Sequence, residues 1–410
     1  MLNGDEEQYS QNLDEFLKKI TLWYENDYEG FKTMYDAAVE NVVPYPADTP
    51  EEVRCDWKGK DIQFLCDFFA EWYHWRSGVN NGLDYIEKFS WINYENDYGM
   101  VFVTSGPGFK MTADFTHLQG LQMDDEGPDG QKLIEKWVKE LGPKRMADFE
   151  PGPWPTFNKF FTRELKDGAR PIAPQDEDDS VVVAPADCVI NMIVDELTET
   201  TPIPVKTVTM NVRQLLGDSD YAEAFIGGTA VSCILMPDTY HWYHSPVKGQ
   251  VVEAREDLRG VYYGMRDFPE LLNKGNVGYG YDYEMFDNFR RGYLVIKTWY
   301  PDAEGKNSEV GFVGMVPVGL NSIASVNFLE KFQGLAPGLT MPVPVEKGEK
   351  IGNFMYGGSL NILLFEPGRF PALQLLQGQR IGVLEQPERT AGLFTGSYHT
   401  QSRRRRPLAP

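Results

Sequence analysis

The chain has 410 residues, 42% of them hydrophobic and 24% charged, which is typical of a folded protein with a sizeable core. Its 61 acidic and 39 basic side chains give a formal net charge of −22. A surface this negative repels nucleic acid and anionic membrane surfaces, which are therefore disfavoured as partners. The absence of an apolar run of about 20 residues predicts no integral membrane segment. A polar N-terminus without a signal peptide and four cysteines without metal-type spacing favour a cytoplasmic location.

The N-terminal region is predicted to be helical. Apolar residues recur at spacings of three and four over residues 13–23, and an aromatic stripe repeats this pattern over 61–76. A third amphipathic helix is predicted over 129–141. Residues 77–128 mix Gly, Asn and Asp with short apolar pieces and predict no definite element. The three prolines within 146–155 indicate a linker.

After the linker, short β-branched runs alternate with Gly/Pro turns, a pattern typical of packed strands. One helix, over 211–217, interrupts them. The sequence therefore predicts an α+β protein: a helical region over 1–150, followed by a β-rich catalytic domain of mainly antiparallel sheets over 151–390. Residues 391–410, which include the basic run Arg403–Arg406, are expected to form a disordered tail.

Two histidines, His241 and His244, lie three residues apart in the β-rich region. This spacing would suit a metal on a helix, but flanking prolines favour a strand or turn, and no further ligand follows at a suitable distance. Packed or surface histidines are the alternative. A general acid/base role is favoured because histidine titrates near neutrality.

Ser359 follows two glycines and precedes an apolar strand. Such a sequence is common in tight turns, but glycine also permits a strained turn in which a hydroxyl approaches the preceding carbonyl. Asp187, in a Pro-Ala-Asp turn, has the ordinary role of bonding its local backbone. Together the aspartate, the histidines and the serine are the ingredients of an activated nucleophile, although the sequence does not establish that they converge.

Five segments occur in the order found in the phosphatidylserine decarboxylase family, and over residues 154–385 the chain resembles that family. The segments are FNKFFTRELKDGARPIA (157–173), Pro185-Ala186-Asp187, LLGDSDYAEAFIGG (215–228), the stretch from Tyr240 to Gly249 with both histidines, and Gly-Gly-Ser before LLFEPG.

The resemblance implies a proenzyme that cuts itself between Gly358 and Ser359 and converts Ser359 into a covalent pyruvoyl group. No pyridoxal phosphate and no metal are then expected. His244 is implied as the base for self-cleavage, Asp187 as its charge partner, and His241 as a helper in substrate handling or protonation. The two fragments are expected to stay associated, in a chain that could also form a homo-oligomer.

The implied chemistry suits these residue types. Attack of the Ser359 hydroxyl on the Gly358 carbonyl replaces the amide by an ester. β-Elimination then releases the N-terminal chain, which ends in the Gly358 carboxylate, and leaves dehydroalanine. Hydrolysis of dehydroalanine releases ammonia and gives the pyruvoyl group. Its ketone would form a Schiff base with the substrate amine and accept the electrons released when CO₂ leaves, the task that pyridoxal phosphate performs elsewhere.

Two residues depart from the family pattern. Cys188 stands where a glycine is usual after the aspartate, and it is expected to tighten that turn. Leu360 stands where a threonine or serine is usual after the cleavage serine. If that hydroxyl assists cleavage, maturation of this chain is expected to be slow.

The substrate expected from the negative charge and the long helical region is a free aromatic L-amino acid, as for soluble relatives of the family that act on tryptophan. Phosphatidylserine, converted to phosphatidylethanolamine, is the alternative. Outside decarboxylation, one hypothesis is an uncleaved Ser-His-Asp hydrolase, which the absence of a Gly-x-Ser-x-Gly motif around Ser359 disfavours. The other hypothesis is an inactive binding homologue, since VEKGEKIGNF resembles the turns of biotinyl or lipoyl carrier domains. Against it, this stretch lacks the lysine of a carrier-type Met-Lys turn.

Overall fold

The computed structural model describes residues 9–47, 49–79, 81–172, 179–195, 212–236, 238–258, 260–263, 289–302, 304–320 and 326–370, with residues 373, 374 and 377. By internal packing these residues form two compact units. The helical unit contains the described residues up to Glu140, Trp154–Asn158 and residues 261–263, and the β-rich unit contains the others. The α+β class predicted above is confirmed. The predicted domain limits at 150 and 390 stay predictions, and the 391–410 tail lies outside the described residues.

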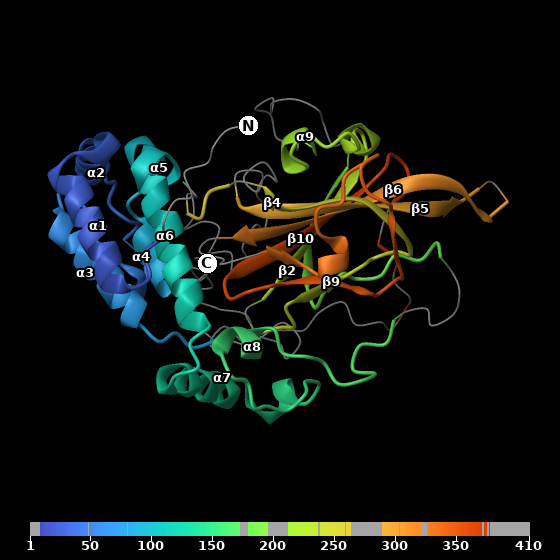
Figure 1. Ribbon diagram of the computed structural model, residues 1–410, viewed down its shortest axis with the longest axis horizontal. Coiled ribbons are helices and arrows are strands. Elements are labelled where there is room, and N and C mark those ends of the chain that lie inside the picture. Colours follow the sequence, from blue (N-terminus) through green and yellow to red (C-terminus); the bar gives the residue numbers. More distant parts are fainter. Residues whose placement is uncertain are drawn as a thin grey trace, which may run out of the picture. The chain divides into compact units, whose positions relative to one another are not determined.

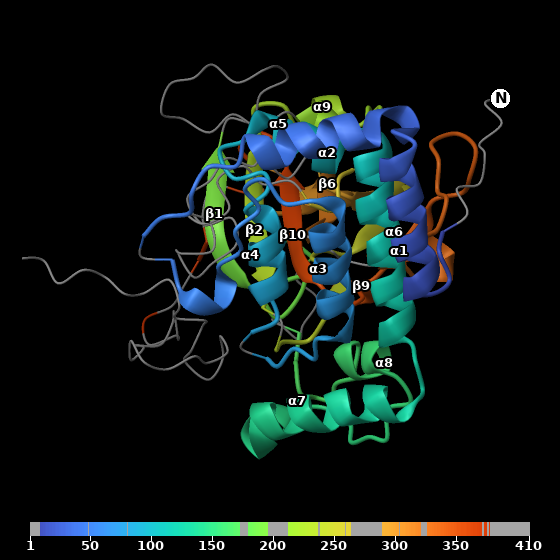
Figure 2. The same cartoon turned by 90° about the vertical axis from the view of Figure 1, so that its left-hand side faces the viewer.

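Helices are present at the three N-terminal stretches where apolar periodicity predicted them, over 13–23, 61–76 and 129–141. α1 and α3 lie side by side in the helical unit (Figure 2), and both begin at a side-chain cap. Asn12 accepts a bond from the Glu15 amide at 3.0 Å, and Asp61 accepts one from the Phe64 amide at 3.0 Å. The helices are α1 Leu13–Glu25, α2 Phe31–Glu40, α3 Ile62–His74, α4 Asp84–Ser90, α5 Asp97–Thr104, α6 Gly106–Met123 and α7 Pro128–Met146.

The stretch 77–128, in which no element was predicted, contains three of these helices. α6 explains the difficulty, because its buried residues are distributed around the helix and include Gly108, Thr112 and Asp114 as well as apolar side chains. A helix buried on most sides shows no amphipathic stripe, and periodicity therefore cannot reveal it. No helix among the described residues combines the length and the apolar character needed to cross a membrane.

The β-rich unit contains a seven-stranded and a three-stranded sheet, and all the described pairings are antiparallel, as predicted. The larger sheet has the order β1-β2-β10-β6-β5-β4-β8, so β10 lies between β2 and β6 (Figure 1). The smaller has the order β3-β9-β7. The strands are β1 Val189–Asp195, β2 Thr229–Leu235, β3 Trp242–His244, β4 Gly249–Leu258, β5 Arg291–Pro301, β6 Asn307–Leu320, β7 Val326–Phe328, β8 Val343–Val345, β9 Lys350–Phe354 and β10 Gly358–Phe365.

A shared core joins the two sheets of this unit. Cys233 and Leu235 of β2 and Leu363 of β10 pack in one cluster with Tyr243 of β3 and Phe354 of β9. Because side chains alternate along a strand, every second residue of β10 faces this core. Two further short helices are α8 Phe157–Phe161 and α9 Val212–Leu215, the latter within the helix predicted over 211–217.

Candidate active site

Ser359 is the second residue of β10, a central strand of the larger sheet. It lies opposite Leu235 of β2 and Gly319 of β6. The residue is 1% exposed, and its hydroxyl has no hydrogen-bond partner in the part of the chain that the structure describes. Gly357, just before the strand, has a φ of 148°, a conformation that strongly favours glycine. The two-glycine turn is thus followed directly by the buried Ser359 hydroxyl, which has no partner among the described residues.

His241 is connected to the turn that precedes Ser359. The amide of Phe354, at the end of β9, donates to the His241 carbonyl at 3.0 Å. The ring of Phe161 stacks on the His241 ring with centroids 3.8 Å apart, and it contacts Tyr356 edge-on at 5.3 Å. Segments near residues 161, 241 and 356 therefore meet beside the chain leading into β10.

The imidazole of His241 is held in its neutral form. The residue is fully buried, and within the described structure neither ring nitrogen has a hydrogen-bond partner. Burial, together with the positive charge of Arg163, lowers its pKa to about 3. In this form one ring nitrogen carries a proton and the other a lone pair, and the predicted role of His241 stays a prediction.

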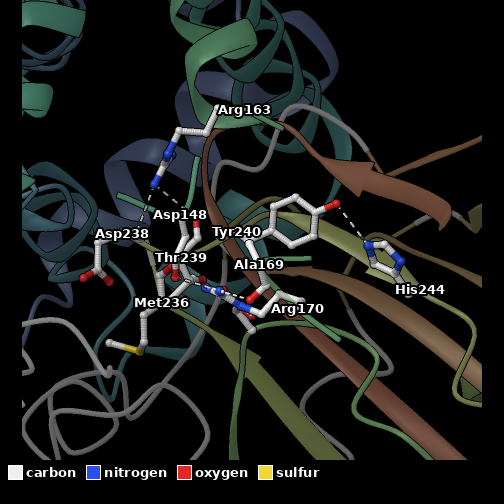
Figure 3. Close-up of polar contacts among 10 residues, drawn as sticks. Asp148, Arg163, Ala169, Arg170, Met236, Asp238, Thr239, Tyr240 and His244 are labelled. Carbon is white, nitrogen blue, oxygen red and sulfur yellow. Dashed lines mark hydrogen bonds and ion pairs between the residues drawn. The ribbon is translucent and has the colours of Figure 1, made fainter. Parts of the chain in front are cut away.

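His244 lies at the end of β3, and both of its ring nitrogens are engaged. Nδ1 is 2.8 Å from the Gly348 carbonyl, which can only accept, so Nδ1 carries the proton. Nε2 then accepts from the Tyr240 hydroxyl at 3.0 Å (Figure 3). Burial lowers the pKa of His244, while the Gly348 bond and the charge of Asp187 oppose that shift. Nε2 of His244 therefore carries the lone pair of the ring, and its predicted role as a base stays a prediction.

Asp187 is bound by an arginine rather than by histidine. Nε and one terminal nitrogen of Arg170 donate to its two carboxylate oxygens, each at 2.8 Å. The remaining terminal nitrogen donates to Asp148 at 2.7 Å (Figure 3). A planar guanidinium matches both oxygens of a carboxylate at once, which a single imidazole N–H cannot do. Asp187 thus acts on His244 through its charge and not through a hydrogen bond.

A second buried arginine supports the histidine segment. Arg163, 2% exposed, donates to the carbonyl of Asp238 at 3.0 Å (Figure 3). Burial lowers the pKa of Arg163 to about 10. Arg145 pairs with the Asp238 carboxylate at 3.1 Å, so two arginines anchor the residues just before His241.

Arg163, Arg170 and Tyr240 lie within the motifs that resemble the family, but those motifs alone predict no role for them. Asn361 was not predicted either. The signal for Asn361 is present in the sequence, because it is a polar residue within an apolar strand, two positions after Ser359 and on the same face.

The four predicted residues do not form an assembled triad. The Ser359 hydroxyl is unpartnered within the described residues, His244 is bound to Tyr240 and Gly348, and Asp187 is bound to Arg170. A hydrolase that acts without cleaving itself needs serine bonded to histidine and histidine bonded to a carboxylate. This geometry is instead compatible with a Ser359 hydroxyl that reacts once, with the carbonyl of the preceding residue.

The two departures from the family pattern lie in different surroundings. Leu360 is fully buried and pairs with Ile234 and Val318, so it is on the opposite face of β10 from Ser359. Cys188, after Asp187, lies beside the buried Cys233, and their contact together with burial raises the pKa of the Cys233 thiol. The predicted effects of both departures stay predictions.

Together, the α+β architecture and the buried serine after two glycines define a candidate self-processing protein with no assembled hydrolytic triad. Comparison with known proteins gives the family. The model of phosphatidylserine decarboxylase matches residues 157–386, more than half of the chain, and the chain therefore belongs to the phosphatidylserine decarboxylase family. The predicted resemblance is confirmed.

Relatives of known name agree. The chain is 31% identical over 264 residues to the phosphatidylserine decarboxylase proenzyme of Anoxybacillus flavithermus, an alignment that covers 63% of this chain and 84% of the relative. It is 28% identical over 243 residues to that of Fusobacterium nucleatum, covering 59% and 70%. It is 28% identical over 276 residues to proenzyme 2 of rice, covering 67% and 39%. The family consists of pyruvoyl-dependent carboxy-lyases, so the chain is a decarboxylase of that kind.

The residues around β10 fit a pyruvoyl group formed from Ser359. The group requires a serine whose hydroxyl is not bound elsewhere, preceded by a backbone that can bend towards it. Ser359 has the first property and Gly357 the second.

Proposed function

We propose that the chain matures by cleavage between Gly358 and Ser359 and then removes the carboxylate of phosphatidylserine as CO₂. The observation that carries the proposal is the Ser359 hydroxyl, buried and unpartnered among the described residues on a central strand of the family's matched region. The pyruvoyl group, once formed, supplies the electron sink for decarboxylation. The protein's own residues must then supply the base, its orientation and a dry site.

His244 is the proposed base for maturation. Its bond to the Gly348 carbonyl leaves the lone pair at Nε2, and its pKa below the ordinary value keeps that lone pair free at neutral pH. Tyr240 holds this nitrogen until the base is needed, and Asp187 stabilises the charge that the ring acquires. His241 is proposed to move protons during turnover, because its neutral ring lies in the same buried segment.

Phosphatidylserine is supported over a free aromatic amino acid by the names of the relatives. The relatives reported above are phosphatidylserine decarboxylase proenzymes, and two are covered over 70% or more of their length. The main prediction made from charge and the helical region lacks such support. A free amino acid stays the second candidate, because a net charge of −22 disfavours binding to anionic lipid surfaces.

Cleavage is tested on the purified full chain by a denaturing gel and intact-mass analysis. The wild type should give residues 1–358 and a fragment beginning at a pyruvoyl-blocked residue 359. Ser359→Ala should stay uncut and release no CO₂. Ser232→Ala is the matched control, because Ser232 is also buried and unpartnered within the described structure but pairs with Ile362, on the opposite face of β10. An active wild type that remains a single uncut chain would contradict the proposal.

The substrate is tested by comparing CO₂ release from phosphatidylserine vesicles with release from free L-tryptophan and L-serine. Phosphatidylserine should be consumed at least tenfold faster, measured as kcat/KM. The reverse order would contradict the lipid substrate while leaving the cleavage proposal intact.

A further inference from the structure

Asn361 is a polar residue at a buried position of β10 whose surroundings are mainly apolar. It lies in the run Ser359–Phe365 of β10, opposite Cys233 of β2 and Pro317 of β6. The residue is completely buried. Neither the oxygen nor the nitrogen of its amide has a hydrogen-bond partner anywhere in the described ranges.

Such a side chain destabilises the protein in which it is found. A buried amide without partners loses its bonds to water and gains nothing in exchange, whereas leucine at the same position would pack with the surrounding core. Buried polar groups that lack partners are rare in native proteins and call for an explanation. A ligand that binds the amide is one such explanation.

The register places this amide beside the reacting residue. Ser359 and Asn361 are two positions apart on a strand without a bulge, so both side chains project from the same face, separated by about 6.6 Å along the strand. The residues opposite Ser359 are Leu235 and Gly319, and neither brings a polar side chain. Asn361 is therefore the polar side chain of β10 that lies next to the proposed pyruvoyl position on this face.

We infer that Asn361 is a substrate-positioning residue whose amide nitrogen donates to the α-carboxylate that leaves as CO₂. This inference rests on the proposed function. The α-carboxylate is common to phosphatidylserine and to free amino acids, and a substrate joined at residue 359 carries it only a few atoms from the reacting carbon. Asn361 thus favours binding of an α-amino acid headgroup over the corresponding amine, because only the amino acid carries the carboxylate that accepts its bond.

A neutral amide suits this task better than a cation. An arginine would stabilise the carboxylate in the ground state and so raise the barrier to losing it, because only interactions that are stronger in the transition state accelerate the reaction. An uncharged donor orients the carboxylate, while the apolar Cys233, Leu235 and Pro317 give its charge little solvation. The site therefore combines alignment with an environment that favours a neutral product.

The inference is tested with Asn361→Leu in the full chain, with Asn361→Ala as a second variant. Both should be cleaved as completely as the wild type. Asn361→Leu should raise the melting temperature, because it removes an unsatisfied buried amide, and yet raise KM by about ten- to a hundredfold. Ser232→Ala is the control, since it removes a buried unpartnered group of the described core from the opposite face and should leave KM unchanged.

Two arms identify the group that is recognised and its source. In the first arm, KM is measured for phosphatidylserine vesicles and an inhibition constant for phosphatidylethanolamine. In the second arm, KM is measured for free L-tryptophan and an inhibition constant for tryptamine. The inhibition constant of each amine should be the same in wild type and Asn361→Leu, because the amine lacks the carboxylate. The arm in which wild-type turnover is seen identifies the source as a lipid headgroup or a free amino acid.

Failure of the inference and failure of the proposed function give different results. A wild type that releases no CO₂ from any of these substrates contradicts the proposed function itself. An active wild type with an unchanged KM in both variants contradicts only the role of Asn361. Loss of cleavage, a lowered melting temperature in Asn361→Leu, or an equal rise in KM and amine inhibition constant would each show a structural role and overturn the inference.

Discussion

The helical unit and the β-rich unit treat their buried polar groups differently. In the helical unit the indole N–H of Trp57 donates to the Lys88 carbonyl at 2.7 Å. The carboxylate of Asp114 accepts from the Ser10 hydroxyl at 2.8 Å and pairs with Lys19 at 2.7 Å. These bonds satisfy buried polar atoms within a dense aromatic core. They indicate that the polar residues of this unit contribute mainly to its stability.

Around β10 the pattern is reversed. Ser359, Asn361 and both nitrogens of His241 have no partners within the described residues. The helical unit also contains such atoms among the described residues, including the Thr116 hydroxyl and the side-chain oxygen of Asn96. Asn96, however, bonds through its amide nitrogen to the carbonyls of Ala38 and Ile92, whereas the Asn361 amide bonds through neither atom within the described chain. Several unsatisfied groups on one strand and its neighbouring segment reduce stability together. The difference indicates that function, and not packing, selects these residues.

The largest effect is expected from removing the proposed base in the β-rich unit. His244→Ala should slow cleavage by about 10²- to 10⁴-fold, because it removes the lone pair that takes the serine proton. The rate is measured from the appearance of the fragments on a denaturing gel after synthesis. Tyr240→Phe, which removes only the hydroxyl bound to Nε2, should change the rate by less than tenfold. Cleavage of His244→Ala at the wild-type rate would remove the assigned role.

A substitution in the helical unit should have the opposite signature. Trp57 is fully buried and contacts Phe64, Phe68 and Phe89 edge-on. Trp57→Ala should lower the free energy of unfolding by about 3–5 kcal/mol through the cavity and the lost bond to Lys88, as measured by denaturant titration. At temperatures where the variant is folded, cleavage should be complete. A folded but uncut variant would show that the two units do not differ in the way described.

The effect that is smallest per unit of change is a dependence of stability on pH that comes from His241. Its pKa is about 3 in the folded protein and about 6.5 when unfolded, so below pH 6.5 the unfolded chain binds more protons. Stability from this residue is therefore full above pH 6.5 and falls by up to about 1.4 kcal/mol per pH unit towards pH 3. Denaturant titrations across this range should show a shallower fall in His241→Gln. An identical slope in the two proteins would mean that His241 is not held neutral.

Much of the fold could be predicted from local patterns. Apolar residues at spacings of three and four predicted α1 and α3, and β-branched runs between turns predicted β2, β5 and β10. These patterns are local because a helix or a strand must present one face to the core. α6 escaped prediction because it is buried on most sides. α2 escaped it because the helix has only ten residues, over which a pattern of buried positions is short.

The sequence by itself determined the family, through five motifs in order, and with them the candidate serine, histidines and aspartate. Only the tertiary structure decided how they are connected. It placed Arg170, and not His244, on Asp187, it set the tautomer of His244 through the Gly348 carbonyl, and it left the Ser359 hydroxyl unpartnered within the described chain. The physical reason is that motifs specify residue types, whereas hydrogen bonds depend on distance, direction and competition between donors far apart in the sequence.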